Sequence, residues 1–219
     1  MEETRVESGI NLYSKLFGLM FLGVGLTAVV SIFCYNSGMA VHIAVENGFN
    51  MLLAIEIIVV VVFRFLLPKV SPTVATALFF IYAAINGVTI SIIYLIYQMS
   101  SMLTILILSA LLFAGFAIVG HTTKKDLTNL GNICIGVLFA GIIASLINLF
   151  MRNTMFDIVI SWVMLLVFFG ITAFDMQKIK IYEEEGIHGN KLYIYGALEL
   201  YLDFINIFLR ILSIFGKKK

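Results

Sequence analysis

The sequence predicts an all-α integral membrane protein, a bundle of seven transmembrane helices with a central C-terminal helix. Hydrophobic residues make up 61% of the 219 residues and charged residues only 12%, whereas soluble domains average about 45–50% and about 25%. The mean hydropathy is +1.06. The apolar runs are continuous rather than alternating, which favours helices over barrel strands. We expect a single membrane domain over residues 1–219.

Seven apolar stretches, each close to the roughly 20 residues that a helix needs to cross a bilayer, follow one another along the chain. Pro68 and Pro72 mark a tight connection between the second and third stretches. A very short link at 98–101 follows the third, the polar loop 121–129 precedes the fifth, and a charged loop at 177–191 precedes the seventh. The predicted spans are 12–35, 44–67, 73–97, 101–120, 130–151, 156–176 and 193–215.

The distribution of basic residues predicts a cytoplasmic N-terminus. With that orientation, Arg152 is the one basic residue in the outer loops up to the sixth span. The inner segments hold Arg5, Lys15, Arg64, Lys69, Lys124, Lys125, Lys178, Lys180 and Lys191. Seven crossings then place Lys217–Lys219 outside, against the rule, so either the last segment re-enters or the tail is an exception. We favour seven crossings, in a bacterial inner membrane.

Several function classes are excluded by composition. The net charge is +1 and the longest basic block is Lys217–Lys219, which argues against a nucleic-acid partner. Cys34 and Cys134 are isolated in apolar segments, so a disulfide framework or zinc site is not expected. No nucleophile, metal or phosphate-binding motif can be placed. We expect a non-enzyme without a resident cofactor.

The last apolar stretch, GALELYLDFINIFLRILSIF, carries four polar residues three or four positions apart: Glu199, Asp203, Asn206 and Arg210. On a helix these positions share one face. A carboxylate near the middle of such a helix is costly unless it faces a protein interior or a water-filled path, usually with a partner. Asp203 is therefore a candidate functional residue, with Glu199 and Asn206 as supporting polar groups.

Asp175, at the end of the sixth span, is the natural partner of Asp203. Two neighbouring carboxylates tend to hold a proton between them, and when deprotonated they can bind a hard cation such as Ca²⁺. Asp175 and Asp203 are thus the candidate proton-sensing and Ca²⁺-binding residues. The alternative, that Asp175 only caps its helix in water beside Lys178 and Lys180, stays open.

The second predicted span holds two further ionisable residues. Glu56 lies mid-membrane, and Arg64 follows two turns later, where it could pair with Asp175 and close the path. Two alternatives stay open: Arg64 can extend to the lipid head groups, and Glu56 can be a neutral, hydrogen-bonded acid between helices.

Four motifs resemble the Bax inhibitor-1 family, also called the transmembrane Bax inhibitor motif family, and specifically its bacterial YccA-like members. They are FIYAAINGVTISIIYLIY, GHTTKKDLTNLG, FFGITAFDMQKIK and GALELYLDFINIFLRILSIFG. The last two together are highly specific. The sequence departs modestly from the family, with Phe174 where tyrosine is common and a lysine-rich tail where arginine is often seen.

The resemblance implies six helices around a hydrophobic seventh and a pH-sensitive calcium leak whose sensor is Asp175 with Asp203. A family arginine that latches the closed state maps onto Arg64, with Lys69 as the runner-up, and a family glutamate maps onto Glu56. The expected partners are the lipid bilayer, Ca²⁺ and protons. The alternative function is a non-conducting regulator of a membrane-bound AAA protease, or of cell death or the stress response, as in other members.

Overall fold

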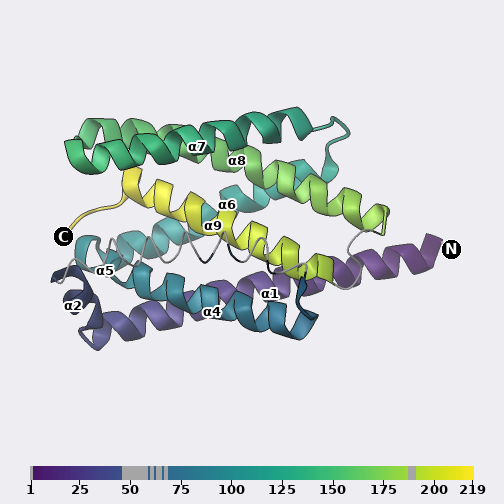
Figure 1. The fold of residues 1–219 in the computed structure, drawn as a ribbon, viewed down its shortest axis with the longest axis horizontal. Coiled ribbons are helices and arrows are strands. Elements are labelled where there is room, and N and C mark those ends of the chain that lie inside the picture. Colours follow the sequence, from purple (N-terminus) through teal and green to yellow (C-terminus); the bar gives the residue numbers. More distant parts are fainter. Residues whose placement is uncertain (1, 46–58, 60–61, 63–65, 67–68, 187–190) are drawn as a thin grey trace. The chain divides into compact units, whose positions relative to one another are not determined.

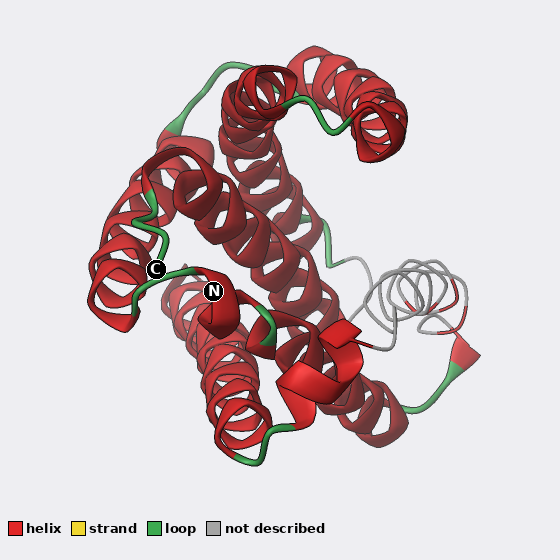
Figure 2. Cartoon of the chain, turned by 90° about the vertical axis from the view of Figure 1, so that its left-hand side faces the viewer, coloured by secondary structure: helices red, strands yellow, loops and turns green. Residues whose placement is uncertain are grey.

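The computed structural model describes residues 2–45, 59, 62, 66, 69–186 and 191–219. Every regular element within these residues is a helix, as Figure 2 shows. The helices are α1 (Glu2–Asn36), α2 (Met39–Val45), α4 (Pro72–Ser91), α5 (Ile93–Ile96), α6 (Met99–Thr122), α7 (Thr128–Met151), α8 (Thr154–Glu184) and α9 (Leu192–Phe215). The all-α prediction is therefore confirmed for the described part of the chain.

Within the described residues, five helices are long and apolar enough to cross a membrane: Asn11–Asn36, Pro72–Ile96, Met99–Thr122, Thr128–Asn148 and Thr154–Glu184. Helix α9 has the necessary length but carries three ionisable residues, Glu199, Asp203 and Arg210. The predicted second span, 44–67, falls for the most part outside the described residues. The chain is thus a multi-pass membrane protein, and the count of seven spans stays a prediction.

Helix α4 begins where its sequence predicts. Ser71 is the N-cap, its side chain accepts a hydrogen bond from the Val74 amide at 3.4 Å, and Pro72 occupies the start of the helix. Both choices satisfy or remove amide groups that have no partner within the helix. The predicted third span, 73–97, is divided at Ile92, after which the short helix α5 continues.

Helix α8 is longer than the predicted sixth span, 156–176. Helix α8 continues to Glu184, eight residues past the expected boundary at 176, so the first part of the expected charged loop is helical. The extension is held by its polar side chains, because Gln177 bonds to the backbone of Lys125 and Leu127 and Lys180 donates to the carbonyl of His121. Asp175 consequently lies inside a helix rather than at its end.

The described chain forms two compact units. The first comprises Met1–Gln98, His188–Leu198 and Lys218–Lys219, and its main contact is between α1 and α4 (Figure 1). Gly87 makes this contact close, since a Cβ there would lie 2.8 Å from the backbone oxygen of Thr27. The Thr27 hydroxyl also donates to the carbonyl of Ala83 at 2.9 Å.

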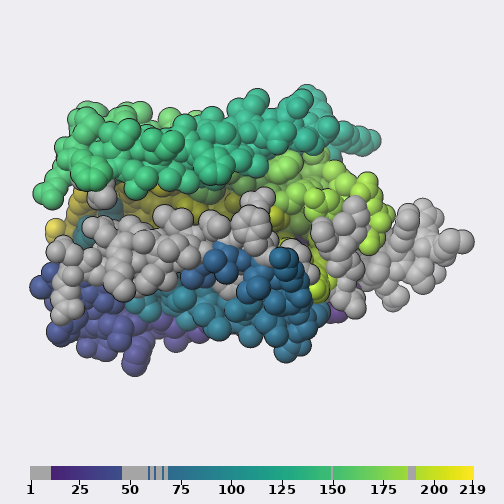
Figure 3. Space-filling view, viewed as in Figure 1, coloured from purple at the N-terminus to yellow at the C-terminus, as the bar shows by residue number. Residues whose placement is uncertain are grey.

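The second unit comprises Met99–Ile187 and Glu199–Lys217. Within it, α8 packs against both α6 and α7 (Figure 1). Phe116 stacks on Phe169 with ring centroids 4.2 Å apart, and Phe113 meets Phe204 of α9 edge to face. By contrast, many large apolar side chains of α7 are exposed, and Figure 3 shows α7 at the surface of the unit. Such an apolar surface is expected to contact lipid.

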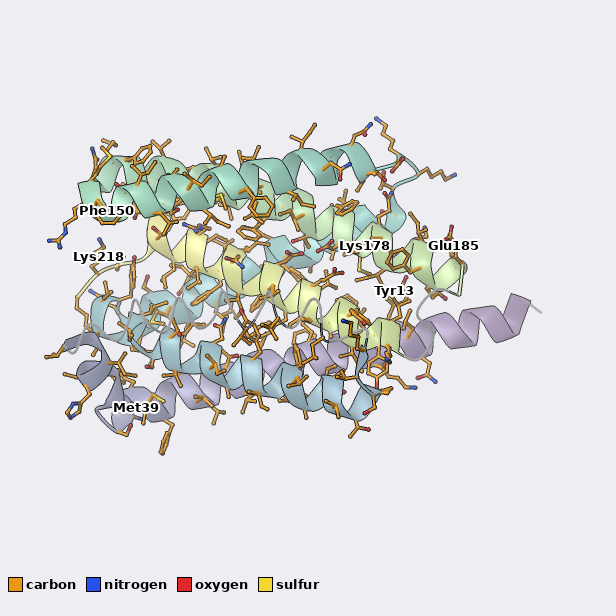
Figure 4. All side chains as sticks on the ribbon, viewed as in Figure 1. Tyr13, Met39, Phe150, Lys178, Glu185 and Lys218 are labelled. Carbon is orange, nitrogen blue, oxygen red and sulfur yellow. The ribbon has the colours of Figure 1, made fainter. Side chains whose placement is uncertain are left out.

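The tail beyond α9 lies at the end of α1 farthest from the N-terminus. The Lys219 ammonium donates to the Tyr35 hydroxyl at 3.1 Å and to the Tyr94 carbonyl at 2.7 Å, and Lys218 lies at the same end as Met39 (Figure 4). Helix α9 is continuous over Leu192–Phe215, and whether the last segment crosses the membrane or re-enters stays a prediction. Which end faces the cytoplasm stays a prediction.

Replacing Gly120 with alanine should destabilise the protein by about 1–3 kcal/mol, the range typical of overpacking. A Cβ at position 120 would overlap the backbone of Ala173 where α6 crosses α8, so the helices would have to separate. Gly115 on the same helix has no atom near the equivalent position, and Gly115→Ala is the control. The free energy of unfolding in detergent should be clearly lower for Gly120→Ala than for the control and the parent protein. Equal stabilities would refute the close crossing.

Candidate functional site

Helices α8 and α9 bring a cluster of charged side chains together within the second unit. Asp175 and Lys178 lie three positions apart on α8, and Glu199 and Asp203 lie four positions apart on α9. These spacings place each pair on one face of its helix. Lys178 is labelled on α8 in Figure 4. We call these four residues the charged cluster.

Lys178 joins the cluster by two ion pairs. Its Nζ lies 2.9 Å from Asp175 Oδ1 and 2.7 Å from Glu199 Oε1. The ammonium also lies 5.6 Å from the centre of the Phe174 ring, a distance at which a cation is attracted to the face of an aromatic ring. One cation thus links two carboxylates from different helices, at the point where α9 enters the second unit.

Asp203 completes the cluster as its most buried carboxyl group, with 3% of the residue exposed. It interacts electrostatically with Asp175, Glu199 and Lys178, and the Thr172 hydroxyl lies beside it. Its Oδ2 atom is buried and makes no hydrogen bond. Three carboxyl groups thus lie around one lysine, so the cluster carries more acidic groups than basic ones.

The structure places the other predicted site residues as follows. Asp175 is buried, with 8% exposed, so the alternative of a solvated helix cap is wrong. Asn206 donates to the carbonyl of Leu202 on its own helix and does not belong to the charged cluster. Lys69 is exposed and lies in the first unit. Glu56 and Arg64 lie outside the described residues.

Gln177 is a positioning residue that the sequence did not reveal. Its side chain is 2.8 Å from both the carbonyl of Lys125 and the amide of Leu127, so it fixes the loop between α6 and α7 to the helix carrying Asp175 and Lys178. In the same loop, hydrogen bonds from Thr128 hold the pKa of Asp126 below its ordinary value. Lys178 itself could have been found, because it follows Asp175 at the spacing of a helical ion pair.

A resident metal site is not evident in the described part of the chain. No group of three or more histidine, cysteine, aspartate or glutamate side chains is arranged there to hold an ion. The use of Asp175 and Asp203 as Ca²⁺ ligands therefore stays a prediction, and it concerns an ion in transit.

Comparisons with known proteins agree with the helical membrane architecture. The sequence model of the family "Bax1-I: Inhibitor of apoptosis-promoting Bax1" matches residues 10–219. The chain is 33% identical to "Inner membrane protein YbhL" of Escherichia coli K12, covering 97% of this chain and 94% of that protein. It is 35% identical to an uncharacterized protein of Borreliella burgdorferi (94% and 91% covered) and 36% identical to an uncharacterized membrane protein of Streptococcus pyogenes serotype M3 (98% and 96% covered).

The two ion pairs of Lys178 predict a measurable coupling. Lys178→Met should lower the free energy of unfolding by about 1–3 kcal/mol, since hydrogen bonds to charged groups contribute on that order. Because Glu199 is one of its two partners, Lys178→Met and Glu199→Gln should be less than additive in a double-mutant cycle measured by unfolding in detergent. Lys124→Met, at an exposed loop position, is the matched control. Strict additivity would refute the contact.

Proposed function

The chain belongs to the Bax inhibitor-1 family of multi-pass membrane proteins, and we propose that it is a pH-sensitive cation leak whose transported ion is Ca²⁺. The observation that supports the proposal is the charged cluster itself. Three carboxyl groups and one lysine meet between two long helices, and ionisable groups in such helices are retained chiefly along ion and proton pathways.

The four groups have different roles in this proposal. Asp203 is the group that a passing ion or proton contacts, because its Oδ2 has no hydrogen bond to give up. Lys178 blocks the cation-binding position, because its ammonium lies between Asp175 and Glu199, where a cation would otherwise bind. An ion can bind the acidic oxygens once Lys178 has moved away.

The direction in which the flux responds to pH follows from the ion pairs of Lys178. Protonation within the charged cluster removes negative charge that holds Lys178, so acidification weakens its attachment. Lys178 is therefore released as the pH falls, and the ion flux increases. Arg64, the predicted latch, lies outside the described residues; in this proposal the described cation Lys178 performs the closing step.

The proposal predicts distinct effects for the two aspartates. Asp203→Asn should reduce Ca²⁺ flux, because the carboxylate that receives the ion is lost. Asp175→Asn should raise the flux at neutral pH and flatten its pH response, because Lys178 loses a charged partner. The measurement is Ca²⁺ release from proteoliposomes over a pH series, and Asp126→Asn, at an exposed loop carboxylate, is the control.

The proposal fails if both substitutions leave the flux and its pH dependence unchanged. An impermeable protein that co-purifies from native membranes with a membrane-bound AAA protease would instead favour the non-conducting regulator.

A further inference from the structure

Helix α9 carries a polar stripe that extends well beyond the charged cluster. Glu199, Asp203, Asn206, Arg210 and Ser213 follow one another at intervals of four, three, four and three residues. These intervals keep all five on one face of the helix, over about 21 Å at 1.5 Å per residue. The first half of the stripe is acidic and the second half contains a cation.

Arg210 is a half-buried arginine on α9. Its Nε atom is buried and makes no hydrogen bond. Asp157, in the first turn of α8, is the carboxylate that interacts with it electrostatically. Beyond it, Ser213 receives a hydrogen bond from Ser161 of α8 at 3.1 Å, so the stripe continues to face α8. A guanidinium keeps its charge at all physiological pH values.

We infer that Arg210 is a selectivity residue: a fixed positive charge on the stripe that hinders divalent cations more than monovalent ones. The inference rests on the proposed function, because it requires ions that contact Asp203 to move along the face of α9 between α8 and α9. Such ions pass Arg210 two turns from Asp203. Asp157 offsets part of this charge and so tunes its strength.

The valence of the ion gives the inference its test. The Coulomb energy between Arg210 and an ion is proportional to the charge of the ion, so the barrier is twice as high for Ca²⁺ as for K⁺. Because rates depend exponentially on barriers, removing the charge should multiply Ca²⁺ flux by the square of the factor for K⁺. A general loosening of the helices would instead raise both fluxes by similar factors.

The experiment compares Ca²⁺ and K⁺ flux in proteoliposomes for the full chain and for Arg210→Gln. We expect Ca²⁺ flux to rise about tenfold and K⁺ flux about threefold, its square root. Arg210→Lys keeps the charge and should keep the parent ratio, and Arg152→Gln, at an exposed loop arginine, is the control for arginine loss elsewhere.

A second variant should change the ratio of Ca²⁺ flux to K⁺ flux in the opposite direction. Asp157→Asn removes the offsetting carboxylate, so it should lower Ca²⁺ flux more than K⁺ flux, which keeps the test decisive if Arg210→Gln does not fold. If the flux ratio is unchanged in both variants while the parent flux depends on Asp203, the inferred role of Arg210 is overturned and the proposed function stands. A parent protein that carries no flux overturns the proposed function and, with it, this inference.

Discussion

The contact on which the site depends is the one between Lys178 and its two carboxylates. Charged groups in a membrane helix are tolerated only with local compensation, and Lys178 provides it for Asp175 on its own helix and for Glu199 on the next. The same contact fixes where α9 meets α8. Gln177, one residue earlier, attaches this part of α8 to the loop between α6 and α7, so the charge arrangement and the helix packing support each other.

Hydropathy located the described helices well, but helix α8 continues beyond the apolar stretch predicted for the sixth span. It reports where a chain is suited to lipid, whereas a helix continues as long as its backbone and side chains find partners. Helix α8 continues past residue 176, where Gln177 bonds to the loop after α6 and Lys180 bonds to the last turn of α6. The close crossing at Gly120 was equally hidden, because a glycine in an apolar run does not reveal which backbone it approaches.

The candidate site could be predicted in part. Spacing identified the face shared by Glu199 and Asp203, and the cost of a buried carboxylate required a partner, for which Asp175 was the natural choice. Spacing could not say that Lys178 turns toward both helices rather than toward solvent, since a lysine near a helix end has both options. It also could not show that Thr172, one turn before Asp175, would lie beside Asp203.

The polar atoms without hydrogen bonds are informative about what the stripe on α9 does. A seam whose polar groups were all paired would be a rigid core, because any ion entering it would first have to break existing bonds. Asp203 Oδ2 and Arg210 Nε, both buried and both without a hydrogen bond, lie seven residues apart on the same face, about 10 Å along the helix. That separation keeps the two charges from neutralising each other in a direct pair. An acidic group and a basic group can therefore coexist on one helix without pairing, which is the combination that the proposed leak requires.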